Sequence, residues 1–395
     1  LQRTFGTGNS ELFSVSFWWK VGNLTDVTFL NAESGASSRW RYDTASQALQ
    51  IYSVGDSSYV YTPSIYRDPS AWYHVLLVWD LSQDSGSRVK WYVNGVQQTV
   101  TLSTEPTSGS TYVINTAIAH EIGAREGSSI FMDGYLSQYC FIDNAAKAVT
   151  DFGEFDDNGV WRPIDITGLD YTGTNSFLLD FADSSNLGND VSGNDNDWAS
   201  SGLAADDQVT DTPTSNFPTW SPIDFSSSVP LSNGNLVATF TSSWYSGVST
   251  FSIPSSGKWS FQGQSSNQTF YFGIVAEGQG YGDMDTTSTD ALYYYGNEAN
   301  FRTNRSGSAV NETTNVPPKV AADTNMEFLI DMDNKQIGVV ISDTVYMAVD
   351  SGLAILDTET KIFTSGLNGT VTCDFGQGGY EPSQTGYKAL STANL

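Results

Sequence analysis

Basic side chains are scarce in this chain. Its 395 residues include 17 Lys and Arg but 44 Asp and Glu, which gives a formal net charge of −27. Binding to a phosphate backbone depends on Lys and Arg displacing counterions, so we expect no nucleic-acid partner. The same charge opposes docking on an anionic membrane. Acidity of this kind keeps an extracellular or high-salt protein soluble, and it also supplies carboxylates for binding Ca²⁺.

Cysteine and long apolar runs are also nearly missing. Cys140 and Cys373 lie in strand-like runs in different halves, so we expect two separate buried thiols and not a disulfide. No apolar run is long enough to span a bilayer and no signal peptide is visible, so we expect no membrane insertion. The chain starts at Leu1 and stops in KALSTANL, and we expect it to be a piece of a longer protein.

Histidine occurs only twice, which limits acid–base chemistry. His74 alternates with Trp72 and Leu76 on an apolar run, a pattern typical of a hydrogen-bonded core imidazole. His120 stands beside Glu121 without a nucleophile. A Ser-His-Asp arrangement stays open, but nothing selects one among so many serines.

A pair of catalytic carboxylates is missing as well. Retaining glycoside hydrolysis needs two carboxyl groups about 5 Å apart across the sugar. The nearest string, from Glu154 to Gly159, lacks a second Glu and runs into an Asn-Gly turn, and Asp331 and Asp333 have no Glu in register. We therefore expect no enzyme activity.

No long stretch has apolar residues at helical spacing, and the sequence instead favours β-strands. Residues 72–79 are apolar on both alternating faces, which predicts a central strand covered on both sides. Residues 89–93 alternate, and Asn94-Gly95 then predicts a tight hairpin turn into residues 96–100. Residues 12–19 place Ser14 and Ser16 opposite an aromatic face, which predicts a sheet with one wet side. Further short strands are expected at 27–30, 38–42, 49–53, 59–62, 111–114, 117–122, 134–142 and 176–181, and in the second half at 236–240, 248–253, 257–262, 269–275, 291–295, 327–331, 336–342 and 370–375.

Four motifs of the first half occur in an informative order. They are AWYHVLLVWD, VKWYVNGV, HEIGAR and FMDGYLSQYCFID. This order resembles the laminin G/concanavalin A-like jelly-roll family, in which a Trp-x-His strand, a strand ending in Asn-Gly, an Ile-Gly segment and an Asp-Gly strand recur. The resemblance implies a sandwich of two antiparallel sheets, and laminin G-like domains often bind Ca²⁺ at a sandwich rim.

Two further resemblances cover the rest of the chain. The pieces SGKWSFQ, YFGIV, FLIDMDNKQIGVV and VTCDFGQ resemble the SPRY domain, another two-sheet sandwich. The strings FGEFDDNGVWRPIDITG, NSFLLDFADSSNLGNDVSGNDNDW, DQVTDTPTSNF and GYKALSTANL resemble structural or fibre-like proteins of marine tailed bacteriophages.

We therefore predict an all-β protein of two tandem concanavalin A-like antiparallel β-sandwiches. The first, at residues 1–205, is laminin G-like, and the second, at 231–380, is SPRY-like. Residues 206–230, rich in Pro, Ser, Thr and Asp, form a linker or strap that Phe217, Trp220, Ile223 and Phe225 pin at intervals. Residues 381–395 form an extended arm.

One loop gathers oxygen-bearing side chains that suit Ca²⁺, which takes six to eight oxygen ligands. The candidate ligands are Asp183, Asp190, Ser192, Asn194 and Asp197. The string is not an EF-hand, because its Gly is misplaced and no Glu closes it. The alternative is a loop whose side chains cap its own backbone.

Sugar binding needs exposed aromatic rings beside polar side chains that bond hydroxyl groups. The candidates are Trp244, Tyr245, Tyr293, Tyr295, Asn297 and Arg302, with Tyr294 and Asn300 in the same run. An alternating Tyr run is more often half core and half surface, so at most some of these rings are free.

The resemblances imply a structural protein of the virion that acts outside the cell. We predict a tail fibre or receptor-binding adhesin, without covalent chemistry, whose partners are other virion proteins and a host-surface glycan. Weak single sites suffice because several copies multiply avidity, and we expect a homo-oligomer, with a trimer as the guess. The alternatives are a capsid decoration or head-fibre protein, and a polysaccharide depolymerase or glycosidase.

Overall fold

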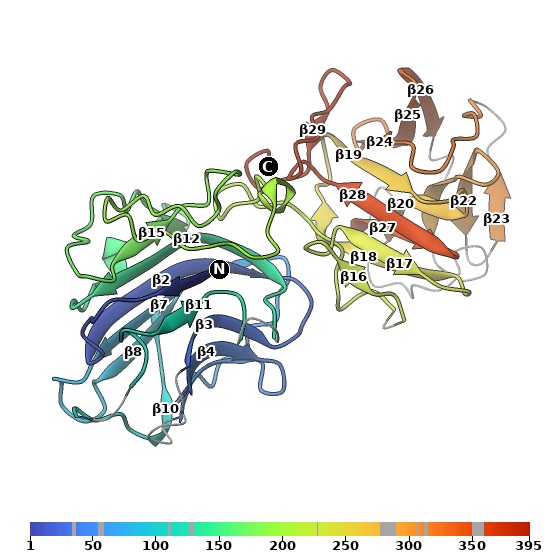
Figure 1. Cartoon of the computed structure of the whole chain (residues 1–395). Helices are drawn as coiled ribbons and strands as arrows, with labels where there is room; N and C mark the ends of the chain where they lie inside the picture. The colour runs from blue at the N-terminus through green and yellow to red at the C-terminus, as the bar shows by residue number, and fades with distance from the viewer. Residues whose placement is uncertain are drawn as a thin grey trace. The chain divides into compact units, whose positions relative to one another are not determined.

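The computed structural model describes residues 1–33, 37–53, 59–109, 112–125, 130–226, 228–276, 290–305, 308–311, 315–349 and 359–395. In these ranges the helices are two short 3-10 turns, η1 (Val149–Asp151) and η2 (Ala205–Asp207), so the predicted all-β class is confirmed. No helix there is long and apolar enough to cross a membrane. The chain divides into two compact units, Leu1–Gln208 and Val209–Leu395 (Figure 1).

The first unit is a sandwich of two antiparallel sheets. The seven-stranded sheet has the order β1-β11-β3-β4-β5-β6-β10, and the six-stranded sheet has the order β15-β12-β2-β7-β8-β9. In chain order the strands are β1 (Gln2–Thr4), β2 (Leu12–Val21), β3 (Val27–Glu33), β4 (Ser37–Asp43), β5 (Ala48–Ser53), β6 (Tyr59–Tyr61), β7 (Trp72–Asp80), β8 (Val89–Val93), β9 (Val96–Gln98), β10 (Thr101–Thr104), β11 (Ala119–Glu121), β12 (Gly134–Asp143) and β15 (Phe177–Leu179).

Strand β7 lies between two apolar layers, as predicted. Val75, Leu77 and Trp79 pack in the core between the two sheets. Leu76 and Val78 pack on the outer side, against side chains from residues 145–171. The hairpin of β8 and β9 is also confirmed, with positive φ angles of 48° at Asn94 and 78° at Gly95.

The outer face of the six-stranded sheet is not wet, which corrects the prediction for residues 12–19. Ser14 and Ser16 are buried, because η1 and the hairpin of β13 (Gly153–Phe155) and β14 (Trp161–Pro163) belong to a segment that covers this face. The strand predicted at 111–114 is also wrong over residues 112–114, which form a loop whose side chains pack in the core. The neighbouring strand of this region is β10, which ends at Thr104. Thr111 lies outside the described residues.

The second unit also contains two sheets. One has the order β16-β17-β28-β19-β24-β25-β26, with β29 paired in parallel to β19, and the other has the order β18-β27-β20-β21-β22-β23. The strands are β16 (Leu231–Ser232), β17 (Val237–Phe240), β18 (Tyr245–Ile253), β19 (Lys258–Ser265), β20 (Phe270–Ala276), β21 (Ala291–Tyr295), β22 (Asn300–Arg305), β23 (Ser308–Asn311), β24 (Met326–Asp331), β25 (Gln336–Ile341), β26 (Thr344–Val349), β27 (Thr360–Gly366), β28 (Gly369–Asp374) and β29 (Lys388–Ala389). One apolar cluster contains side chains from both sheets.

The two segments that flank this sandwich are packed against it. Phe217, Trp220 and Phe225 are buried, whereas Ile223 is exposed and pins nothing. The C-terminal residues, predicted as an extended arm, include β29, which pairs with Trp259 and Ser260 of β19 beyond the end of the β19–β28 pairing. Glu327 accepts hydrogen bonds from Tyr380 and Ser383 and so holds the same segment.

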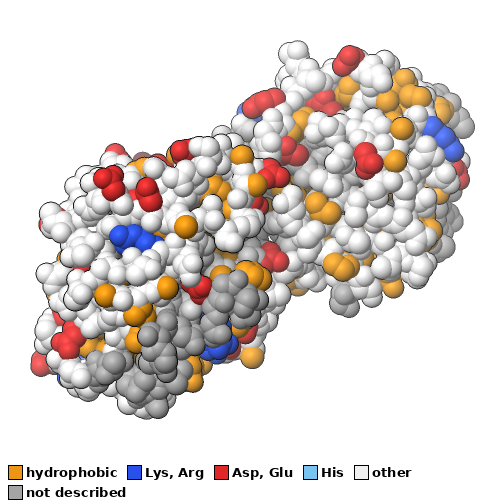
Figure 2. Space-filling model, viewed as in Figure 1, with side chains coloured by type: hydrophobic (Ala, Val, Ile, Leu, Met, Phe, Trp, Pro, Cys, Tyr) orange, Lys and Arg blue, Asp and Glu red, His pale blue; other side chains and the backbone are white. Residues whose placement is uncertain are grey.

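The surface in Figure 2 is mainly uncharged, with acidic side chains scattered over both units. This view matches the composition, in which charged residues make up only 15% of the chain. Both cysteines are free and buried, as predicted. Burial raises the pKa of the Cys140 thiol to about 12.

Candidate functional site

The outer face of the six-stranded sheet in the second unit carries an aromatic cluster. Along β21, Leu292 and Tyr294 point into the sandwich core, whereas Tyr293 and Tyr295 point to the outer face. Tyr271 lies opposite Tyr295 on the neighbouring β20. The predicted division of the Tyr run between two faces is therefore present, but Tyr293 on the outer side is itself fully buried.

Trp244 lies at the edge of this cluster and is only partly buried. Its ring stacks on Tyr271 with centroids 4.5 Å apart and an interplanar angle of 12°. Its edge meets Tyr295 at 6.2 Å. The stack against Tyr271 holds one face of the indole and fixes its orientation, while the side chain as a whole stays partly exposed.

Arg302 brings charge to the same face. It lies opposite Tyr293 on β22, and its guanidinium carbon is 4.6 Å from the centroid of the Tyr295 ring. It donates to Asn311 Oδ1 at 2.9 Å and forms an ion pair with Glu298 at 2.7 Å. The hydrogen bond from Arg302 lowers the pKa of Glu298, whose side chain is 43% exposed, so the carboxylate stays ionised and accessible.

Two amides complete the arrangement. Asn300 lies opposite Tyr295 and donates weakly to Glu298 at 3.4 Å, and its Oδ1 is buried without a hydrogen-bond partner in the described part of the chain. Asn297 is exposed and donates to the Tyr295 hydroxyl. We refer to Trp244, Tyr271, Tyr295, Asn297, Glu298, Asn300 and Arg302 as the outer-face cluster. It combines a ring face, cationic donors and carboxylate acceptors.

Not every predicted sugar-binding residue joins this cluster. Tyr245 follows Trp244 directly and therefore points to the other side of the sheet, where it packs against the core. Sequence reasoning missed Tyr271 and Glu298. The alternation in TFYFGIV could have indicated Tyr271, whereas the place of Glu298 depends on the hairpin between β21 and β22.

The predicted Ca²⁺ loop satisfies its own backbone. Asp190 accepts hydrogen bonds from the backbone amides of Leu178, Ser192 and Asn196 and from the Ser192 hydroxyl. Asp197 in turn accepts from the Asp190 amide at 2.8 Å.

The other two candidate ligands are used in the same way. Asn194 donates to the carbonyls of Tyr171 and Ser176, and Asp183 caps Ser185. The described residues contain no group of three or more His, Cys, Asp or Glu side chains that could hold a metal ion. The geometry thus has the form of the capped loop, and the Ca²⁺ site stays a prediction.

The two histidines lie inside the first unit. His74 Nε2 is 2.9 Å from the Ser16 hydroxyl, and both side chains are buried. His74 Nδ1 has no partner among the described residues, so the pair lacks the third member of a triad. Burial lowers the pKa of His74 to about 3 and that of His120, which stacks on Phe5, to about 4.

Two of the carboxylates considered for hydrolysis take part in structural contacts. Asp156 caps its own turn and pairs with Arg162 at 3.0 Å. Asp331 pairs with Lys258 at 2.8 Å and accepts from Asn334. Each of these acids has a structural partner.

Comparison with known proteins identifies the class of the first unit. Residues 4–148 match the family model described as the concanavalin A-like lectin/glucanases superfamily, in its laminin G form. This match agrees with the laminin G/concanavalin A-like resemblance predicted from the motifs of the first half. A search of curated proteins finds no significant match.

Similar solved structures include two SPRY domains. The TRIM65 PSpry domain has 11% identity, covers 40% of this chain and 92% of that chain, and has a TM-score of 0.32. The SPRY domain of human HERC1 has 14% identity, with 39% and 96% covered and a TM-score of 0.32. The carbohydrate-binding module CBM66 from Bacillus subtilis has 8% identity, with 40% and 91% covered and a TM-score of 0.27. At TM-scores this low, the three likenesses carry no argument about function.

Proposed function

We propose that this chain is a carbohydrate-binding adhesin without covalent chemistry, and that its second unit binds a host-surface glycan through the outer-face cluster. One observation carries the proposal: the partly exposed Trp244 and the Arg302 of the Arg302–Glu298 pair both lie against the Tyr295 ring. The apolar face of a sugar ring packs against an aromatic ring, and its hydroxyl groups both donate and accept hydrogen bonds.

The polar members of the cluster match these hydroxyl groups. Glu298 accepts hydrogen bonds through an exposed carboxylate, and Asn300 Oδ1 is an acceptor without an internal partner among the described residues. Arg302 supplies donors in a fixed plane above Tyr295. The family matched by the first unit is described as lectins and glucanases, which supports sugar binding for the chain as a whole.

Binding without hydrolysis is supported by the state of the carboxylates. Glu298 is tied to a cation, which lowers its pKa and disfavours a role as general acid. The Ser16–His74 pair is buried away from any substrate. A depolymerase would instead release reducing ends from host polysaccharide, and this assay separates the two functions.

The place of this adhesin is proposed to be the surface of a bacteriophage particle, as a tail fibre or receptor-binding protein in a homo-oligomer. Only the sequence resemblance to marine phage proteins supports this part. Capture of the purified chain by bacterial cells supports an adhesin. Capture by purified capsids, with no binding to cells, would indicate a decoration protein.

The direct test is binding of the chain to an array of bacterial surface polysaccharides. We expect Trp244→Ala to weaken binding at least about tenfold, since losing one central aromatic contact costs more than about 1.4 kcal/mol. Tyr245→Phe is the matched control, because the adjacent ring points into the core and should leave binding unchanged. Equal binding by wild type and Trp244→Ala at every glycan would refute the outer-face cluster as the site.

Calcium is tested in the same assay by adding EDTA. We propose Ca²⁺ as the candidate cofactor at Asp183, Asp190, Ser192, Asn194 and Asp197. If it holds that loop in a binding form, chelation weakens binding and added Ca²⁺ restores it. Unchanged binding and thermal stability in EDTA would assign the loop to internal capping alone.

A further inference from the structure

A flap closes the outer face of the six-stranded sheet in the first unit. It comprises residues 148–163, with η1 and the hairpin of β13 and β14, which forms a two-stranded sheet of its own. In the described part of the chain, the hydrogen bonds of this flap stay within it. Its two ends are held by the sheet, where Ser14 accepts from the Lys147 amide and Gln138 donates to the Ile164 carbonyl. Between these ends the flap is attached by side-chain packing.

His74 lies in the packing between the flap and the sheet, and it is fully buried on the outer side of β7. Its ring centroid is 5.8 Å from that of Trp161 and 6.2 Å from that of Phe152, both on the flap, and 5.0 Å from that of Trp18 on β2. Its Nε2 bonds the Ser16 hydroxyl, and its Nδ1 has no partner among the described residues. A protonated imidazole donates from both nitrogens, so protonation would leave a buried N–H without an acceptor.

The charged side chains around His74 do not compensate for a charge on its ring. The charged residues of the flap, of β2, β7, β8 and β12 and of the preceding turn are Lys20, Asp80, Lys90, Asp143, Lys147, Asp151, Glu154, Asp156, Asp157 and Arg162. Among the described contacts, none of them forms a hydrogen bond or ion pair with the imidazole. Burial alone lowers the pKa of His74 to about 3. The closed flap therefore accommodates the neutral ring and disfavours the charged one.

We propose that the flap is an acid-operated device: when His74 takes up a proton, residues 148–163 leave the sheet and expose Trp18 and Trp72, which the closed flap buries. With the flap open, water solvates the imidazole and its pKa returns to about 6.5. Proton binding then favours the open form, and the preference grows as pH falls below 6.5. Between pH 7 and pH 5 the ratio of open to closed flap should rise about twentyfold. The device does not depend on glycan binding by the second unit.

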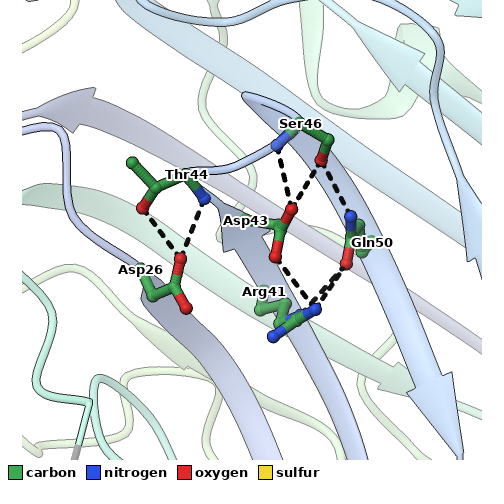
Figure 3. Close-up of polar contacts among 6 residues, drawn as sticks. All are labelled: Asp26, Arg41, Asp43, Thr44, Ser46 and Gln50. Carbon is green, nitrogen blue, oxygen red and sulfur yellow. Dashed lines mark hydrogen bonds and ion pairs between the residues drawn. The ribbon is translucent and has the colours of Figure 1, made fainter.

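The test is amide hydrogen exchange of the full chain, followed by mass spectrometry, with each rate divided by the intrinsic rate at the same pH. An isolated two-stranded hairpin is marginally stable in water, so the amides of β13 and β14 exchange when the flap is open. We expect their protection to fall about twentyfold from pH 7 to pH 5. The reference region is β4 and β5 in the other sheet, where Arg41 donates to Gln50 (Figure 3). Its protection should exceed that of the flap at both pH values, because only the flap opens.

Two matched variants assign the effect to one histidine. His74→Gln keeps an amide that can bond Ser16 but takes up no proton, so the protection of its flap should no longer depend on pH. His120→Gln is the control, because His120 is the other buried histidine of the unit and stacks on Phe5, away from the flap. Its flap should keep the twentyfold loss of protection.

Three results would overturn the inference: unchanged protection of the wild-type flap from pH 7 to pH 5, the same pH dependence in His74→Gln as in the wild type, or equal protection of the flap and the reference region. The last would mean that the unit opens as a whole. The pH at which flap protection begins to fall is a second measurement that needs no variant. Onset near pH 6.5 supports an imidazole, whereas onset only below about pH 4.5 would assign the opening to carboxylates and refute the role of His74.

Discussion

The two six-stranded sheets use their outer faces in opposite ways. In the first unit, Trp18 and Trp72 on the sheet meet Trp161 from the covering segment, and all three are buried. In the second unit, Trp244 stacks on its own sheet and stays partly exposed. Tryptophan on an outer face is therefore no sign of a binding site by itself. The two faces differ in whether another segment of the chain packs over their tryptophan side chains.

The two outer faces also differ in their polar side chains. On the covered face of the first unit, aliphatic side chains of the sheet pack against apolar residues of the segment at 145–171. The outer face of the second unit instead places an ion pair and two amides beside its rings. Buried polar groups are costly without partners, so a face of this composition fits a polar ligand better than a covering segment.

The largest expected effect comes from removing the cover. Trp161→Ala should destabilise the first unit by about 3–5 kcal/mol, because a buried ring that packs on Phe155, His74 and Gly95 leaves a cavity. Trp244→Ala should cost the second unit only about 1–2 kcal/mol, since the side chain is partly exposed. Urea unfolding of the full chain, followed by far-UV circular dichroism, measures both. Similar losses of unfolding free energy in the two variants would contradict the proposed difference between the covered and the uncovered outer face.

Acid should also separate the units, because both histidines lie in the first. In the unfolded chain a histidine binds a proton near pH 6.5, whereas in the folded unit burial lowers the pKa of His74 to about 3 and of His120 to about 4. Stability is thus fully present above pH 6.5 and is lost as pH falls, by about 1.4 kcal/mol per pH unit for each histidine. Between pH 6.5 and 5 the first unit should lose about 2 kcal/mol per histidine.

The control for this pH effect is His74→Gln, which removes the ionisable group and keeps an amide to bond Ser16. Its unfolding free energy should fall less steeply with acid than that of the wild type. Calorimetry at several pH values resolves the transitions. An unchanged slope in the variant would mean that carboxylates, and not His74, set the acid sensitivity.

Strands with a clear local alternation of apolar residues were predicted correctly from the sequence, whereas a strand without such an alternation was missed. The alternation in residues 72–79 and the Asn94-Gly95 turn were sufficient for the hairpin around β7, β8 and β9. The strand β27 (Thr360–Gly366) was missed, although it lies between β18 and β20, because TKIFTSG is short and rich in Thr and Ser.

The candidate site and the flap depended even more on contacts between distant residues. The opposite directions of Trp244 and Tyr245 follow from simple alternation and could have been predicted. The packing of Phe152 and Trp161 over His74 could not, because the local pattern of residues 148–163 does not show which strands this segment covers. Packing between distant segments, and not residue type, assembles the closed flap.

The smallest expected effect on stability comes from the Arg302–Glu298 ion pair of the second unit, and it sharpens the comparison most. Glu298→Gln should lower the free energy of unfolding by about 1 kcal/mol, because Glu298 is 43% exposed and its amide replacement can still accept from the buried Arg302, yet it should weaken glycan binding severalfold. Glu359→Gln, another exposed carboxylate in the same unit, is the matched control.

The hydrogen bond from Arg302 lowers the pKa of Glu298, so its charge is retained as pH falls from 7 to 5 and is lost only below its ordinary range. Glycan binding by the second unit should therefore persist at pH 5, where the first unit is already weakened. Binding titrations at both pH values check this, and a loss of binding in step with unfolding of the first unit would place the glycan there instead.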